Sequence, residues 1–125
     1  MRLWLISLLL LVAAVLFYFL YDLAVNGRWR ISAADARSRL RAGSFDVVID
    51  VRTATERAAL GSYPNSVHIP AADLTAVMPA RYPDKSVAIL VYCNTGHRAR
   101  LATDTLHALG YVNARYISSS HLSLM

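Results

Sequence analysis

The sequence predicts a small α/β domain with a mostly parallel central sheet flanked by helices, preceded by one N-terminal transmembrane helix. Residues Leu3–Leu20 contain no charged side chain and would span about 27 Å as a helix, close to the thickness of the hydrocarbon core of a bilayer. In the rest of the chain, patterns typical of strands alternate with patterns typical of helices, as expected for parallel strands joined by helical crossovers. The stretch Val87–Tyr92 is continuously apolar, as expected for a strand covered on both faces.

Composition narrows the class of protein further. The chain has 125 residues, 56% of them apolar. The residues outside the apolar helix are enough to form one domain. A single cysteine, Cys93, excludes an internal disulfide framework and a zinc site built from paired cysteines. The net charge is +5, but the arginines gather beside the apolar stretch and do not alternate with aromatic residues. Nucleic acid is therefore not an expected partner.

The apolar stretch divides the chain into an anchor over residues 1–25, a linker over 26–31 and a domain over 32–125. A secretory signal would have a shorter apolar core and a small-x-small cleavage site, for which residues 25–27 are a poor match. A retained helix would contact the lipid bilayer through residues 3–25. Arg2 precedes it and a group of arginines closely follows it: Arg28, Arg30, Arg37, Arg39 and Arg41. This imbalance predicts a single-pass membrane protein with its domain in the cytoplasm, and a periplasmic domain is the alternative.

Capping patterns locate two helices in the first half of the domain. Ser32 with Asp35 resembles a capping box, and Gly43 supplies a stop for the helix that follows. Thr53 with Glu56 is a second pattern of the same kind. The predicted elements are a helix over 33–41, a strand over Phe45–Val51 and a short helix that continues through Arg57–Leu60 and ends at Gly61.

The second half contains one weak strand, one or two helical turns, and a longer helix. The weak strand is Val67–Ile69, and the turns are Ala71–Met78, which are expected to end before Pro79. The longer helix starts at Arg98 and ends at Gly110. Its expected apolar face consists of Leu101, Thr105, Leu106 and Leu109, and a last strand over Val112–Ile117 follows it.

Cys93 is the residue on which chemistry is most expected. It ends the predicted strand Val87–Tyr92 directly before a helix, where ligands bind in parallel sheets. Backbone N–H groups at the start of that helix, together with Arg98, would favour a thiolate or a bound anion, and Gly96 allows a tight turn. An inert cysteine in the core is the alternative interpretation.

The segment Cys93-Asn94-Thr95-Gly96-His97-Arg98 resembles the C-x-x-G-x-R active-site loop of rhodanese domains, the thiosulfate sulfurtransferases. The resemblance extends over roughly residues 31–117. Asp50-Val51-Arg52 with Glu56 is similar to the family's D-V-R followed by a glutamate, and residues 67–70 are similar to its N-I-P segment. The chain is most similar to small bacterial single-domain rhodaneses, including the phage-shock type.

The resemblance implies a reaction in which Cys93 takes sulfane sulfur from a donor, holds it as a persulfide and passes it on. It implies a small sulfur-containing anion such as thiosulfate as donor, and cyanide or a thiol as acceptor, with no metal and no cofactor. Cys93 is then the catalytic nucleophile, and the loop binds the substrate, mainly through backbone donors and through Arg98, which closes the loop and steers the anion. Asp50 and Arg52 brace the site. The substrate-binding residues implied are Asn94, Thr95, Gly96, His97 and Arg98.

Two departures from the family define the alternatives. Serines at 119 and 120 stand where the family has a glycine pair, and the usual terminal helix is missing, so we expect a truncated C-terminal end and a sheet face with less cover. These changes favour, as an alternative function, a catalytically weak module that binds a partner through the same loop. A cysteine-based phosphatase is a further alternative, but its loop is one residue longer than Cys93 to Arg98.

Overall fold

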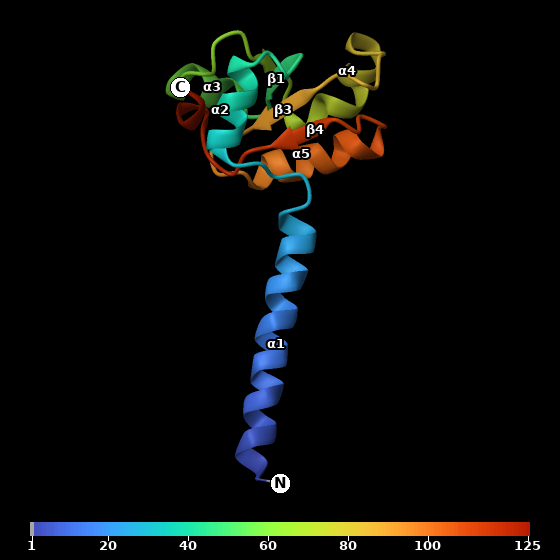
Figure 1. Cartoon of the computed structure of the whole chain (residues 1–125). Helices are drawn as coiled ribbons and strands as arrows, with labels where there is room; N and C mark the ends of the chain where they lie inside the picture. The colour runs from blue at the N-terminus through green and yellow to red at the C-terminus, as the bar shows by residue number, and fades with distance from the viewer. Residues whose placement is uncertain (1) are drawn as a thin grey trace.

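Four parallel strands form the centre of the domain in the computed structural model, which describes residues 2–125 (Figure 1). The strand order is β2-β1-β3-β4, and every residue of the two central strands is buried. These continuous apolar runs are the ones that predicted strands covered on both faces. The α/β fold class is therefore confirmed. The strands are β1 (Val47–Asp50), β2 (Val67–His68), β3 (Ile89–Tyr92) and β4 (Ala114–Tyr116).

Helices cover both faces of this sheet. On one face, α4 (Leu74–Arg81), the 3₁₀ turn η1 (Ala71–Asp73) and α5 (His97–Ala108) pack on side chains such as Ile49 and Val91. On the other face, α2 (Ala33–Arg41) and the 3₁₀ turn η2 (His121–Leu124) cover Val48, Leu90 and Tyr92. Leu90 and Tyr92 are fully buried there. This face is therefore covered, in contrast to the expectation drawn from the C-terminal departures.

Local capping sets the starts of two helices, as predicted. The Ser32 hydroxyl accepts a hydrogen bond of 3.0 Å from the backbone N–H of Asp35 at the start of α2. Helix α3 (Ala54–Leu60) begins at a complete capping box, in which Thr53 and Glu56 satisfy each other's backbone N–H groups. Because these bonds join residues three apart, the local sequence is enough to predict them.

Two helical predictions are wrong in detail. Helix α4 does not stop before Pro79, which lies inside the helix at an exposed position, as does Thr75, four residues before it. In α5, Leu101 is 46% exposed, so it does not belong to the buried face. The residues that face the sheet are instead Ala99, Ala102, Thr103 and Leu106, whose spacing places them on one side of the helix.

Helix α1 (Leu3–Asn26) stands away from the domain (Figure 1). The segment Leu3–Val25 is long and apolar enough to cross a membrane, as a membrane span or a signal sequence can be. The residues that follow pair with the sheet edge: Ile31 donates its backbone N–H to Tyr116 at 2.9 Å, and Tyr116 donates to Trp29 at 3.1 Å. Arg30 thus forms a parallel bridge with Tyr116, and the expected linker is partly an added edge of the sheet.

A candidate cysteine site

Cys93 follows β3 directly, and its sulfur accepts hydrogen bonds from two backbone N–H groups. Its side chain is 1% exposed, and Sγ accepts hydrogen bonds from the N–H groups of Gly96 at 3.0 Å and Ala99 at 3.4 Å. Both donors belong to the turn at the N-terminus of α5. Such donors stabilise negative charge on the sulfur. Of the residues from Cys93 to Arg98, Gly96 therefore contacts the thiol through its backbone, and His97 and Arg98 already belong to α5.

Gly96 adopts a backbone conformation that side chains disfavour. Its φ angle is +102°, and a Cβ atom at this position would lie 2.6 Å from the Cα of Ser118. The absence of a side chain lets the loop lie against the chain just after β4 and point its N–H at the sulfur. Sequence reasoning predicted the tight turn but missed Ser118. Ser118 directly follows the last predicted strand, and the carboxyl ends of parallel strands meet at the same edge of a sheet. Because Cys93 also ends a strand, this position could have indicated that Ser118 lies near the loop.

Asp50 and Arg52 form a fully buried ion pair beside the loop. Arg52 donates to both carboxylate oxygens, from Nε at 2.9 Å and from Nη2 at 2.7 Å. Its Nη1 reaches the loop and donates to the side-chain oxygen of Asn94 at 3.2 Å. This is the place where the resemblance put a brace for the site. The bond to Asn94 is the direct contact between the buried pair and the cysteine loop.

The pair is charged at neutral pH. Burial by itself would raise the pKa of Asp50, but hydrogen bonds from the Arg52 side chain and backbone and from Tyr92 outweigh it and lower the pKa to about 2. The hydrogen bond to Asp50 raises the pKa of Arg52. A carboxylate held in this way is a fixed negative charge that keeps the guanidinium in place.

Two further residues contribute to this cluster, and sequence reasoning missed their roles. The Tyr92 hydroxyl donates to Asp50 at 3.0 Å, and Arg57 donates to the same oxygen at 3.1 Å. Tyr92 precedes Cys93, so its side chain points to the opposite face of the sheet. Arg57 lies on α3 next to Glu56. Its position one residue after the glutamate of the family motif is the signal that could have found it.

Arg98 is held by Glu56. Nη1 and Nη2 donate to the two carboxylate oxygens at 2.8 and 2.9 Å, and both side chains are about one-third exposed. The hydrogen bond from Arg98, followed by the one from the backbone of Thr53, lowers the pKa of Glu56 to about 2. The guanidinium expected to steer an anion is thus also the group that fastens the loop to α3.

One histidine belongs to the loop and another lies in η2. His97 is exposed on its rim, whereas His121 in η2 is 4% exposed and lies near the Tyr92 ring. Burial lowers the pKa of His121, and Arg52 acts in the same direction. Within residues 2–125, no group of three or more His, Cys, Asp or Glu side chains is arranged to hold a metal ion.

The fold and the site together define the class of this protein. It is an α/β domain in which a cysteine follows a central strand and accepts hydrogen bonds from the start of the next helix. Residues 32–120 match the Rhodanese-like domain family, and the chain belongs to this family. The structure is similar to that of a human single-domain sulfurtransferase, with 28% identity, a TM-score of 0.64 and coverage of 76% of this chain and 93% of that one.

Two other solved structures are also similar. A rhodanese-related protein from Thermoplasma volcanium is 29% identical, with a TM-score of 0.62 and coverage of 76% and 88% of the two chains. A Rhodopseudomonas palustris protein of unknown function, described as a possible tyrosine phosphatase, is 23% identical, with a TM-score of 0.66 and coverage of 76% and 77%. At that identity the likeness is one of fold alone. A comparison with curated proteins gives no match.

Proposed function

We propose that this protein is a membrane-anchored sulfurtransferase that carries sulfane sulfur on Cys93 as a persulfide. The observation that carries the proposal is the pair of backbone N–H groups, from Gly96 and Ala99, that donate to the Cys93 sulfur. Membership of the rhodanese-like family and the likeness to a human sulfurtransferase support it. The phosphatase alternative receives no support, because the loop has one residue fewer than that chemistry needs.

The reaction has two displacement steps. The Cys93 thiolate attacks the outer sulfur of thiosulfate, and the S–S bond of the donor breaks as sulfite leaves with the electron pair. Cyanide or a thiolate then attacks the terminal sulfur of the persulfide. The Cys93 thiolate leaves, and thiocyanate or a new persulfide is the product. Both steps exchange anions, so neither requires a general acid or base.

Each part of the loop then has a role. The N–H groups of Gly96 and Ala99 stabilise the negative charge of the thiolate, and the same turn binds the anionic persulfide. Arg98 fastens the loop through Glu56. Arg52, which is paired with Asp50, donates to the Asn94 side chain and so supports the loop at that residue. Thr95 and His97 are exposed on the rim, where a donor anion or an acceptor arrives.

The anchor is the second part of the proposal. We propose that helix α1 crosses the bilayer through residues 3–25. The arginines that follow it support a domain on the cytoplasmic side, and a periplasmic domain is the alternative. The test uses the Cys93→Ser variant with one new cysteine at the exposed position Ser44. A membrane-impermeant maleimide should label this cysteine after cell lysis but not in intact cells. Labelling of intact cells would place the domain outside the cytoplasm.

Intact-mass measurement tests the sulfur chemistry. The full chain in detergent is treated with thiosulfate, with and without a thiol reductant, beside the Cys93→Ser variant. We expect a gain of about 32 Da that the reductant removes and that Cys93→Ser lacks. A folded chain that gains no mass would contradict thiosulfate sulfurtransfer. It would favour a module that binds a partner through the same loop.

A further inference from the structure

A cavity of about 240 Å³ lies where the apolar helix meets the domain, on the outer side of the cysteine loop. Residues 95–97 of the loop form one wall. Asp22 of α1 and Arg30 of the following segment form the wall towards the helix, and Arg100 of α5 and Ser118 complete the cavity. Cys93 does not line the cavity, so the proposed bond-making steps at its sulfur take place outside it, although Thr95 and His97 border both places.

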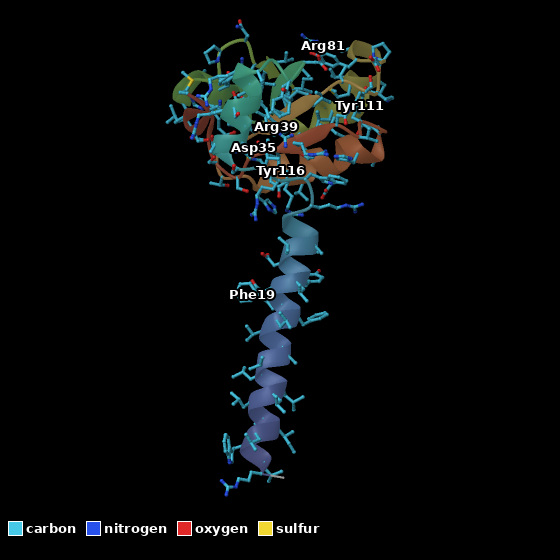
Figure 2. The ribbon with its side chains drawn as sticks, in the orientation of Figure 1. Phe19, Asp35, Arg39, Arg81, Tyr111 and Tyr116 are labelled. Carbon is cyan, nitrogen blue, oxygen red and sulfur yellow. The ribbon has the colours of Figure 1, made fainter. Side chains whose placement is uncertain are left out.

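The cavity lies at the height where the apolar stretch ends. Tyr116, which also lines it, lies at the end of the domain from which α1 leaves (Figure 2). Asp22 is within one turn of Val25, the last residue of the stretch long enough to cross a membrane. The exposed Tyr21 and the nearby Trp29 are residues of the kind found at membrane–water interfaces. In a chain that spans a bilayer, the cavity therefore lies at the level of the lipid headgroups.

The charge of the cavity favours an anion. Arg30 is exposed, and the Arg100 guanidinium is 3.8 Å from Asp104, at the outer limit of an ion pair. The two guanidinium groups exceed the single carboxylate of Asp22 in the lining. A guanidinium binds phosphate oxygens in pairs, which makes arginine the usual residue for such groups.

Hydroxyl groups complete a site of this kind. Thr95 and Ser118 both line the cavity and are able to donate to phosphate oxygens. Burial raises the pKa of the Tyr116 hydroxyl; Arg30 and Arg100 act in the opposite direction, and Asp104 and Asp22 act with burial. The lining thus combines two cations and several neutral donors around one small space.

From this position and chemistry we propose that the cavity binds the phosphate group of an anionic membrane lipid between Arg30 and Arg100. The inference rests on the proposed membrane anchoring and is independent of sulfur transfer. A lipid bound in this way contacts residues 95–97, so it joins the outer side of the cysteine loop to the membrane surface.

Native mass spectrometry of the full chain in detergent tests the proposal, with phosphatidylglycerol and phosphatidylcholine as probes. We expect the wild type to retain one phosphatidylglycerol with an affinity about tenfold higher than for phosphatidylcholine. The double variant Arg30→Gln/Arg100→Gln should lose this preference. The matched control Arg39→Gln/Arg81→Gln removes the same charge at exposed positions elsewhere and should keep it; Arg81 lies at the far end of the domain (Figure 2).

Three outcomes would overturn the inference. These are an equal affinity for the two lipids, an equal loss in both double variants, and displacement of phosphatidylglycerol by millimolar inorganic phosphate, which would make the cavity a site for free phosphate. The single variant Arg30→Gln changes an exposed side chain and should reduce the preference about threefold without unfolding the domain. A preference unchanged in this variant would also contradict the proposal.

Two controls separate this inference from the proposed function. Carbonate extraction of cell membranes shows whether the chain is anchored, since a spanning helix resists extraction. An anchored chain without lipid preference overturns the lipid site alone, whereas an extracted chain overturns the anchor. The Cys93→Ser variant should bind phosphatidylglycerol as the wild type does, whatever the outcome of the thiosulfate experiment.

Discussion

Arg98 and Glu56 form a bidentate ion pair, with Nη1–Oε2 and Nη2–Oε1 distances of 2.8 and 2.9 Å. The same carboxylate accepts the backbone N–H of Thr53 at 2.9 Å. The pair therefore joins the start of α5, which carries the cysteine loop, to the start of α3. Because the Arg98 charge is already engaged, we expect this residue to act on a donor through the position of the loop.

A double-mutant cycle measures this coupling. Glu56→Gln and Arg98→Met should each slow the loading of sulfur from thiosulfate onto Cys93 by about tenfold or more, since small displacements of a loop reduce rates strongly. The double variant should be no slower than the slower single variant. Single-turnover mass measurements give the rates. Additive effects would contradict the prediction and indicate that Arg98 contacts the donor independently of Glu56.

Arg39→Met is a matched control for this cycle. It removes the ion pair of Arg39 with Asp35, at 3.0 Å, which is exposed on α2. Surface pairs of this kind contribute little to stability. The loading rate should therefore equal that of the wild type.

Acidification should destabilise the domain between pH 4.5 and 2. The pKa values of Glu56 and Asp50 are both lowered to about 2 in the folded chain, from ordinary values of 4.5 and 3.8. The unfolded chain therefore takes up protons first as the pH falls. The stability that these carboxylates provide is present above pH 4.5 and is lost towards pH 2.

Thermal unfolding of the full chain in detergent tests this pH dependence. Glu56→Gln should show a smaller fall of the midpoint between pH 4.5 and 2 than the wild type shows. Asp73→Asn, at an exposed position in η1, serves as the matched control and should leave the fall unchanged. The same fall in Glu56→Gln and in the wild type would contradict the assignment to Glu56.

Gly96→Ala should lower both stability and activity. The positive φ alone costs about 1–2 kcal/mol for a residue with a side chain, and the contact with Ser118 forces the loop to move. Movement of the Gly96 N–H away from Sγ removes one of the two donors, so sulfur loading should slow by about a hundredfold.

Gly43→Ala separates the effect of the backbone from that of the contact. Gly43 also has a positive φ, of +70°, but nothing lies within 4 Å of its added Cβ. It should lose about 1–2 kcal/mol of unfolding free energy and load sulfur at the wild-type rate. Equal loading rates in the two alanine variants would show that the Gly96 donor is dispensable.

Two leucines of α5 should differ sharply in their effect on stability. Leu106 is fully buried in the core, so Leu106→Ala should lower the free energy of unfolding by about 2–5 kcal/mol. Leu101 is 46% exposed, and Leu101→Ala should change it by no more than about 0.5 kcal/mol. Thermal unfolding measures both. Similar losses would mean that the helix is rotated relative to the sheet.

The sequence predicts this fold well where the determinants are local. The capping bonds of Ser32 and Thr53 join neighbours three residues apart, and the buried strands are short apolar runs. The errors concern Pro79 and Leu101, whose burial depends on which side of a helix meets the sheet. That choice is made by tertiary packing, in which small alanines allow α5 to approach more closely than the leucines suggest.

In the candidate site, too, the local features can be predicted from the sequence and the long-range contacts cannot. The loop from Cys93 to Arg98 is contiguous, so a short pattern predicts it directly, and the family resemblance predicts supporting roles for Asp50 and Arg52. Ser118 belongs to a separate element, and its contact with Gly96 follows from the parallel order of β3 and β4. No short pattern indicates a contact between residues so far apart in the chain.

The backbone pairing of Trp29 and Ile31 with Tyr116 has a mechanical consequence for an anchored chain. A domain on a flexible linker adopts many heights and tilts above a bilayer. Here only Gly27 and Arg28 lie between the end of α1 and the residues that pair with the sheet edge, so the connection between helix and domain is short. In an anchored chain, this short connection would hold the cysteine loop within a narrow range of heights above the bilayer.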